Sequence, residues 1–187
     1  MRIISGSHRG RNLRPPEGLP VRPTTDMAKE SLFNILNNYV DFEEIRVLDL
    51  FAGTGNISLE FASRGAKSVL SVDLNVKCTD YISKMITEFK FANSTVIRAN
   101  VLAMLARPSG SYDVIFADPP YDLENREKVP ELIFENKWLA EDGWLVMEHD
   151  KRISFKDHLL FYEERRYGKI HFSFFHATLP EVEGNQV

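Results

Sequence analysis

The feature that most constrains the fold is an alternation of short hydrophobic runs with longer amphipathic segments through the middle of the chain. A hydrophobic run, an amphipathic helix and a further hydrophobic run are typical of parallel strands joined by helices. The pattern therefore predicts an α/β protein with a doubly wound sheet. The predicted strands are residues 46–50, 68–73, 95–98, 112–117 and 143–148, and the predicted helices run to residue 64, over 75–91, to residue 107 and over 129–136.

The end of the chain departs from this alternation. Residues 160–167 and 169–175 both have strand character, and Gly168 lies between them. So short a turn joins antiparallel neighbours, because a parallel connection needs a long crossover. We therefore expect a hairpin to close an otherwise parallel sheet.

Two helices have recognisable starts. A connector rich in proline ends near Thr25 and Asp26, either of which can cap a helix whose apolar residues then face the sheet. Thr54 or Asn56 is expected to cap the helix after the first predicted strand.

The first predicted strand leads into a glycine turn. Gly53 and Gly55 let the backbone bend sharply and approach a ligand closely, but Ser58 stands where a dinucleotide fingerprint has its third glycine. Asp73 ends the second predicted strand about twenty residues further on, where an acidic side chain can bind a ribose diol. A Gly-x-Gly turn alone also occurs as a purely structural turn. Together with Asp73 it indicates an adenosine-containing ligand.

A second turn follows the fourth predicted strand and reads Asp118-Pro119-Pro120-Tyr121. The prolines fix φ and remove two backbone donors, so the turn offers acceptors together with the flat face of a tyrosine. The Asp118 carboxylate and the Pro119 carbonyl could accept both hydrogens of an exocyclic amine, while Tyr121 stacks on the ring that carries it. The turn therefore indicates recognition of a nucleobase amine.

These features, in this order, resemble S-adenosylmethionine-dependent methyltransferases that act on base amines. Together with residues 2–13, 22–26 and 30–34, they resemble the bacterial family that methylates guanine N2 in 16S ribosomal RNA. The resemblance implies a Rossmann-like class I methyltransferase fold with a seven-stranded, mostly parallel sheet and an antiparallel last strand. It implies S-adenosylmethionine as cofactor, 16S rRNA as partner, free or in a small-subunit particle, and no obligate protein partner. Short strand-like pieces around Gly6 to Gly10 predict, in addition, an N-terminal β-hairpin arm.

The resemblance also implies roles for individual residues. Asp118, Pro119, Pro120 and Tyr121 would hold the target amine and base. Where relatives commonly carry an acidic residue after the third strand, this chain has Asn100, which leaves the detail of adenine recognition open. The residues implied to bind the cofactor are Asp49, Phe51, Ala52, Gly53, Thr54, Gly55, Asp73, Leu74, Asn100 and Val101.

Two of these acidic residues have structural alternatives. Asp49 could instead be a buried aspartate that caps the glycine turn, and both roles are compatible. Asp73 could instead cap the helix that begins after Asn75.

Positive charge is concentrated ahead of the first predicted strand, in residues 1–25, where five arginines are opposed only by Glu17. We expect residues 1–25 to form a basic arm and connector, and residues 26–187 to form a single methyltransferase domain. The formal net charge of −4 argues against a protein that coats nucleic acid, so any RNA contact should be local. The alternative is a solvated, partly ordered arm. The residues expected to contact RNA are Arg9, Arg11, Arg22, Thr24 and Thr25.

Composition limits the remaining possibilities. Cys78 is the only cysteine, which excludes an intramolecular disulfide and a cysteine-rich zinc site. The five histidines lie at no metal-ligand spacing, so we expect no metal. Residues 150–152 have the composition of a solvated loop. No apolar segment is long enough to span a bilayer or to act as a secretory signal, so we expect a cytoplasmic protein.

Three other functions are compatible with parts of the pattern. A DNA adenine or cytosine amino-methyltransferase would use the same amine-binding turn. An NAD-dependent dehydrogenase would use Gly53, Gly55 and Asp73, but would leave the turn at residues 118–121 unexplained. A catalytically idle RNA-binding or assembly factor could keep the fold without the reaction.

Overall fold

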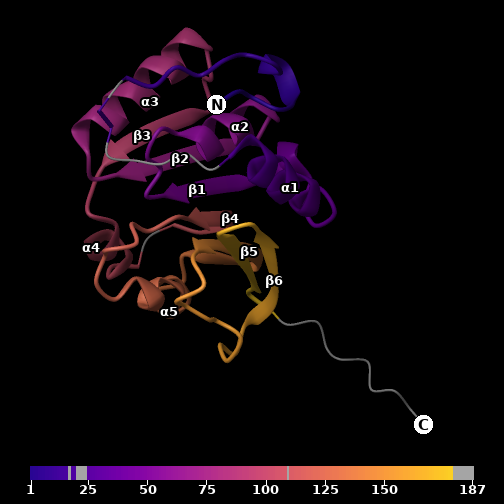
Figure 1. Ribbon diagram of the computed structural model, residues 1–187, viewed down its shortest axis with the longest axis vertical. Helices are drawn as coiled ribbons and strands as arrows, with labels where there is room; N and C mark the ends of the chain where they lie inside the picture. The colour runs from indigo at the N-terminus through magenta and orange to yellow at the C-terminus, as the bar shows by residue number, and fades with distance from the viewer. Residues whose placement is uncertain (17, 20–24, 109, 179–187) are drawn as a thin grey trace.

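The computed structural model describes residues 1–16, 18–19, 25–108 and 110–178, which form a seven-stranded sheet in the order β3-β2-β1-β4-β5-β7-β6 (Figure 1). Strands β1 to β5 pair in parallel, whereas β7 lies between β5 and β6 and runs antiparallel to both. The expected closing hairpin is therefore confirmed. The strands are β1 (Arg46–Leu50), β2 (Ser68–Asp73), β3 (Ser94–Arg98), β4 (Tyr112–Ala117), β5 (Leu139–His149), β6 (Phe161–Tyr167) and β7 (Ile170–His176).

Strand β5 begins before the expected residue 143. Tyr112 pairs with Leu139 and Val114 pairs with Trp144, so the β5 side carries extra residues between these two pairs. Such a bulge bends a strand without ending it. The hydrophobic run in the sequence therefore marks only the regular part of β5.

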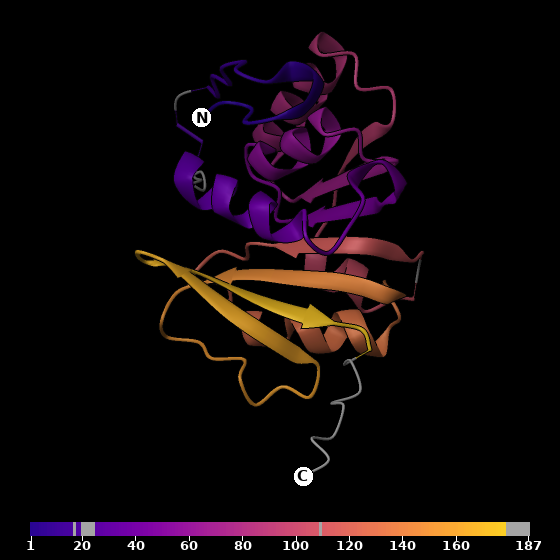
Figure 2. The same ribbon diagram turned by 90° about the vertical axis from the view of Figure 1, so that its right-hand side faces the viewer.

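Helices cover both faces of the sheet, as Figures 1 and 2 show. Apolar side chains of α1, α2 and α3 pack with one face, and those of α4 and α5 pack with the other. The doubly wound prediction is thus confirmed. In the part of the chain that the structure describes, no helix has the length and apolar character needed to cross a membrane. The helices are α1 (Asp26–Leu36), α2 (Asn56–Ser63), α3 (Val76–Glu88), α4 (Val101–Leu105) and α5 (Val129–Glu135).

The N-terminal segment folds back on itself and packs against the domain. Arg2 and Asn12 form an antiparallel bridge, and a 3₁₀ turn (Gly6–His8) lies at the tip, so the hairpin lacks long regular strands. Ile3 and Leu13 are buried in the same apolar cluster as α1 and α2. Burial of these side chains fixes the segment on the surface of the sheet and helices.

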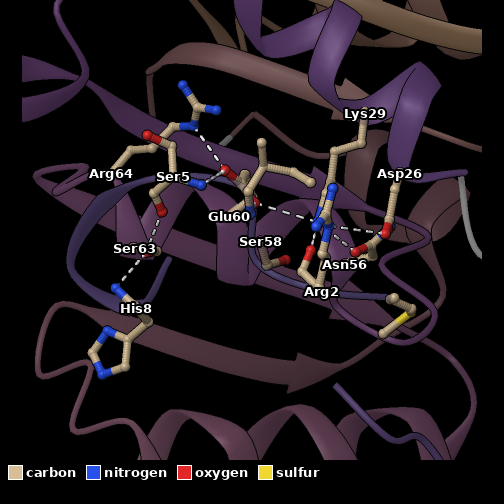
Figure 3. Close-up of polar contacts among 12 residues, drawn as sticks. Arg2, Ser5, His8, Asp26, Lys29, Asn56, Ser58, Glu60, Ser63 and Arg64 are labelled. Carbon is tan, nitrogen blue, oxygen red and sulfur yellow. Dashed lines mark hydrogen bonds and ion pairs between the residues drawn. The ribbon is translucent and has the colours of Figure 1, made fainter. Parts of the chain in front are cut away.

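A buried lysine ties this segment to two helices (Figure 3). The Lys29 side chain of α1 is fully buried, and its Nζ donates to the Arg2 carbonyl at 2.7 Å and to Asn56 Oδ1 at 2.8 Å. Nζ also lies 3.3 Å from Glu60 Oε2 of α2. Burial lowers the pKa of Lys29, and the nearby Glu60 carboxylate opposes that effect.

The Glu60 carboxylate completes the network. Its two oxygens accept hydrogen bonds from the backbone nitrogens of Ile4 (2.7 Å) and Ser5 (3.0 Å), and Arg64 Nε donates at 2.9 Å. One fully buried carboxylate therefore joins the N-terminal segment, α1 and α2. A buried charge is tolerated only when it is paired and hydrogen-bonded in this way.

The network predicts that Lys29→Met lowers the free energy of unfolding by about 3 kcal/mol, because the neighbouring carboxylate loses its buried counter-charge. Urea unfolding measures this change. The matched control is Lys84→Met at an exposed position of α3, for which we expect a change within about 0.5 kcal/mol. Equal effects of the two substitutions would contradict a stabilising role for the buried pair.

Candidate active site

A cavity of about 1230 Å³ opens at the carboxyl ends of the parallel strands. The glycine turn (residues 51–55) and the Asp-Pro-Pro-Tyr turn (residues 118–121) both contribute to its wall. Open α/β sheets bind ligands at this edge. The sequence-predicted residues that line the cavity are Thr25, Asp49, Phe51, Ala52, Gly53, Thr54, Asp73, Leu74, Asn100, Val101, Asp118, Pro119, Pro120 and Tyr121.

Five of the predicted residues lie elsewhere or cannot be placed. Gly55 is not in the cavity wall, and Arg9 and Arg11 are exposed beside the 3₁₀ turn. This turn packs on the carboxyl end of α2, where the His8 nitrogen donates to Ser63 Oγ, away from the cavity. Arg22 and Thr24 lie outside the described residues.

The glycine turn has a left-handed backbone at several positions. Phe51 has φ 59°, Gly53 has φ 54° and Gly55 has φ 70°. Phe51 is the unusual one, because a side chain in this region strains the backbone. A Cβ at Gly55 would lie 2.8 Å from Ile82 Cγ1, so the second glycine is required for close packing against α3.

Asp49 fixes the start of α2. Its Oδ2 accepts a hydrogen bond from the Ser58 nitrogen at 3.0 Å and another from the Ser58 hydroxyl. The helix has Gly55 at its N-cap with no side-chain cap, so the prediction that Thr54 or Asn56 caps it is wrong. A buried carboxylate from β1 can replace a local cap because it reaches the same unsatisfied backbone donor.

Asp49 is also unusual in its ionisation. It is 1% exposed, and burial raises its pKa to about 7 although the Ser58 hydrogen bonds favour the charged form. The side chain both caps the helix and lines the cavity. Its structural role and a role in ligand binding are therefore compatible.

Asp73 bridges the glycine turn and α3. Its Oδ2 accepts from the Gly53 nitrogen at 2.8 Å, and its Oδ1 accepts from the Asn75 nitrogen at 2.7 Å. Each carboxylate oxygen can accept a further hydrogen bond. Asp73 can therefore hold the turn and still accept ribose hydroxyls.

Three more residues line the cavity beyond β2 and β3. Leu74 is 58% exposed and Val101 is 3% exposed, which suits two apolar walls for a flat ring. Asn100 caps α4, because its Oδ1 accepts from the Ala103 nitrogen at 3.0 Å. Its amide nitrogen is then the group best suited to contact an adenine.

The Asp-Pro-Pro-Tyr turn follows β4. Tyr121 is 45% exposed, and the guanidinium carbons of Arg126 and Arg152 lie 5.3 Å and 5.8 Å from its ring centroid. Asp150 holds both cations, with Oδ2 2.8 Å from Arg152 Nε and Oδ1 3.5 Å from Arg126 Nη2. Lys151 and Arg152 are exposed in a turn, as expected for a solvated loop, but Asp150 is half-buried and all three residues line the cavity.

A second acidic residue lies beside Asp118. Glu148 near the end of β5 is 4% exposed and lines the cavity. Burial raises the pKa of Asp118 well above its usual value, and the Glu148 and Asp49 carboxylates raise it further. Sequence reasoning gave Glu148 no role, although an acidic residue that ends a hydrophobic strand at this edge was an available signal.

Strand pairing also brings together histidines that are far apart in the sequence. One ligand atom each of His149, Glu164 and His171 lies within 4.8 Å of the others. His149 already has protein partners, since Nδ1 lies 2.9 Å from the Asp150 carbonyl and Nε2 lies 2.7 Å from Ser173 Oγ. The expectation of no metal stays a prediction.

The sheet order, the inserted antiparallel strand and the cavity at the carboxyl edge define the fold as that of class I methyltransferases. The solved structure of yhhF from Escherichia coli matches with a TM-score of 0.83 and 28% identity, covering 94% of this chain and 97% of that one. The family model for Conserved hypothetical protein 95 matches residues 1–176. The chain belongs to this family.

Two further comparisons are informative. The Ribosomal RNA small subunit methyltransferase D of Buchnera aphidicola subsp. Baizongia pistaciae is 30% identical over 179 residues, covering 94% of this chain and 91% of the relative. The structure of SMU.776 complexed with SAH, the demethylated product of S-adenosylmethionine, has a TM-score of 0.64 and 19% identity, covering 79% of this chain and 49% of that one. At this identity the second likeness shows the fold alone.

The raised pKa of Asp49 predicts a pH-dependent stability. An acid whose pKa is raised on folding stabilises the fold below its unfolded pKa of about 3.9 and loses that contribution as pH rises through about 7. From pH 4 to 7.5, the stability of wild type should therefore fall relative to Asp49→Asn by up to about 4 kcal/mol. Urea unfolding of both proteins at each pH measures the difference, and a constant difference would contradict the prediction.

Proposed function

We propose that this protein transfers a methyl group from S-adenosylmethionine to the N2 amine of a guanine in 16S ribosomal RNA. The observation that carries the proposal is the opening of the glycine turn and the Asp-Pro-Pro-Tyr turn into one cavity. The name of the Buchnera relative supports rRNA methylation, and the class I methyltransferase fold with its glycine turn and Asp73 suits S-adenosylmethionine as donor. The choice of guanine N2 rests on the family resemblance and on the chemistry of the turn.

The residues of the cavity fit this cofactor. Asp73 would accept the ribose hydroxyls, and Asp49 would attract the α-amino group of the methionine part. Leu74 and Val101 would enclose the adenine, and the backbone of residues 51–53 would line the methionine part. When bound, the cofactor supplies a methyl group that its sulfonium already activates.

The Asp-Pro-Pro-Tyr turn would prepare the amine. A guanine amine is a poor nucleophile, because its lone pair is delocalised into the ring. The Asp118 carboxylate and the Pro119 carbonyl would accept its two hydrogens and direct the lone pair outward, so that positioning supplies most of the rate. The raised pKa of Asp118 also suits it to take the proton that the amine loses.

RNA contacts would come from more than one part of the chain. Tyr121 would stack on a base extruded from the RNA, and Thr25 lines the same cavity. Arg9 and Arg11 are exposed near the carboxyl end of α2, away from the cavity, so they would contact phosphates of flanking nucleotides. We expect the reaction in the cytoplasm and without a metal.

A DNA amino-methyltransferase is the second candidate, because the acceptors of the Asp-Pro-Pro-Tyr turn would suit an amine on any base. Labelled S-adenosylmethionine with protein-free 16S rRNA, small-subunit particles and duplex DNA as acceptors separates the two candidates. Label in DNA and none in RNA would overturn our proposal. Binding of NADH in place of SAH would instead favour the dehydrogenase alternative.

We predict that Asp118→Ala reduces methyl transfer at least ~10³-fold, because the amine loses its charged acceptor. SAH affinity should change less than about threefold, since Asp118 belongs to the amine-binding turn. Methyl incorporation and calorimetric titration with SAH measure the two effects. Near wild-type activity would remove Asp118 from the chemistry.

The arginines of the N-terminal segment predict a salt effect. Arg9→Gln and Arg11→Gln should each reduce the slope of log affinity against log salt for 16S rRNA by about 0.7 to 1, which is the effect of losing one phosphate contact. The control is Arg107→Gln, an exposed position next to α4 on the other helix layer. Unchanged slopes for both variants would remove this segment from the RNA interface.

A further inference from the structure

A half-buried carboxylate, Asp118, and a buried one, Glu148, lie next to each other in the wall of the cavity. Met147 of β5 pairs in parallel with Ala117 of β4, so Glu148 and Asp118 are the next residues along the two neighbouring strands. Val146 of β5 pairs with Phe116 of β4, and each lies two residues before the acidic residue of its strand. Because side chains two residues apart point to the same face, Asp118 and Glu148 lie on the same face of the sheet as Phe116 and Val146. Glu148 and Asp118 both line the cavity.

The Asp-Pro-Pro-Tyr turn alone does not distinguish one base from another. Its two acceptors suit the amine of guanine, adenine or cytosine equally. These bases differ at the ring atom beside the amine, where guanine carries the N1–H donor and adenine N1 and cytosine N3 carry lone pairs. An enzyme that reads an extruded base uses hydrogen bonds to this edge.

We propose that the Glu148 carboxylate accepts the N1–H of the target guanine and thereby selects guanine over adenine and cytosine. The assignment rests on the proposed function. Glu148 would receive the hydrogen next to the amine, while Asp118 and Pro119 receive the two hydrogens of the amine. Adenine N1 or cytosine N3 would instead place a lone pair against the Glu148 carboxylate, and the two would repel each other.

The electrostatics of the pair agree with this assignment. Two adjacent carboxylates in this cavity wall repel each other when both are ionised, and the pKa of Asp118 is raised accordingly, first by desolvation and then by Glu148. A guanine edge presents three N–H donors, which are enough to satisfy both carboxylates. Adenine presents two donors and a lone pair, so it would set an acceptor against Glu148 at the place where guanine sets a donor.

A single isosteric substitution tests the proposal, with 2-aminopurine as the probe. This base keeps the 2-amine but has a lone pair at N1. After mass mapping has located the modified guanine in 16S rRNA, two RNA fragments are compared, with guanine or 2-aminopurine at that position. Glu148→Gln keeps the shape of the side chain but adds an amide donor that suits the lone pair of 2-aminopurine.

We expect wild type to prefer guanine over 2-aminopurine by at least ~10³-fold in kcat/KM, because a site built around a donor rejects an analogue that lacks it. Glu148→Gln should lower this ratio at least ~100-fold, because methyl transfer to guanine is reduced and methyl transfer to 2-aminopurine is increased. The control is Glu141→Gln, at an exposed position of the same strand, which should leave the ratio unchanged. SAH affinity of each variant reports whether the cofactor site is intact.

Several outcomes would overturn the assignment. Equal use of guanine and 2-aminopurine by wild type would do so without any variant. An unchanged ratio in Glu148→Gln would also do so, because loss of a purely structural role lowers kcat/KM for both substrates in proportion. If wild type transferred no methyl group to RNA guanine, the proposed function would fail and this assignment with it.

Discussion

The parallel pairing of β1, β4 and β5 is the constraint on which the site depends. It places Asp49, Asp118 and Glu148 at one edge of the sheet, where all three line the cavity. Three acidic groups out of bulk water are costly unless donors or protons compensate them. Ser58 compensates Asp49 in part, whereas Asp118 responds with a raised pKa. A cationic donor and a base rich in N–H groups are the ligands that such a cavity favours.

Much of the fold follows from local sequence patterns. Hydrophobic runs located the strands, and the single-glycine turn at Gly168 identified the closing hairpin, because each signal depends on neighbouring residues only. The start of β5 and the cap of α2 were missed for the opposite reason. The first depends on a bulge opposite β4, and the second on Asp49, which reaches the helix from another element.

The same distinction applies to the site. Both turns were recognised because each is a contiguous run of residues, and the structure brings them into one cavity. The Asp150 contacts with Arg126 and Arg152 were not foreseen, and neither was the meeting of His149, Glu164 and His171. These contacts depend on strand register and on the path of a loop, which hydrophobic periodicity does not encode.

The position of β7 has a consequence for synthesis of the chain. Because Ile170–His176 inserts between β5 and β6, β5 has no partner on that side until residues 170–176 have left the ribosome. During that interval an apolar strand presents unpaired backbone groups, the kind of edge that attracts other chains. Completion of the sheet therefore has to wait for β7, the last of its strands in sequence, and premature termination before residue 170 would yield a product prone to aggregate.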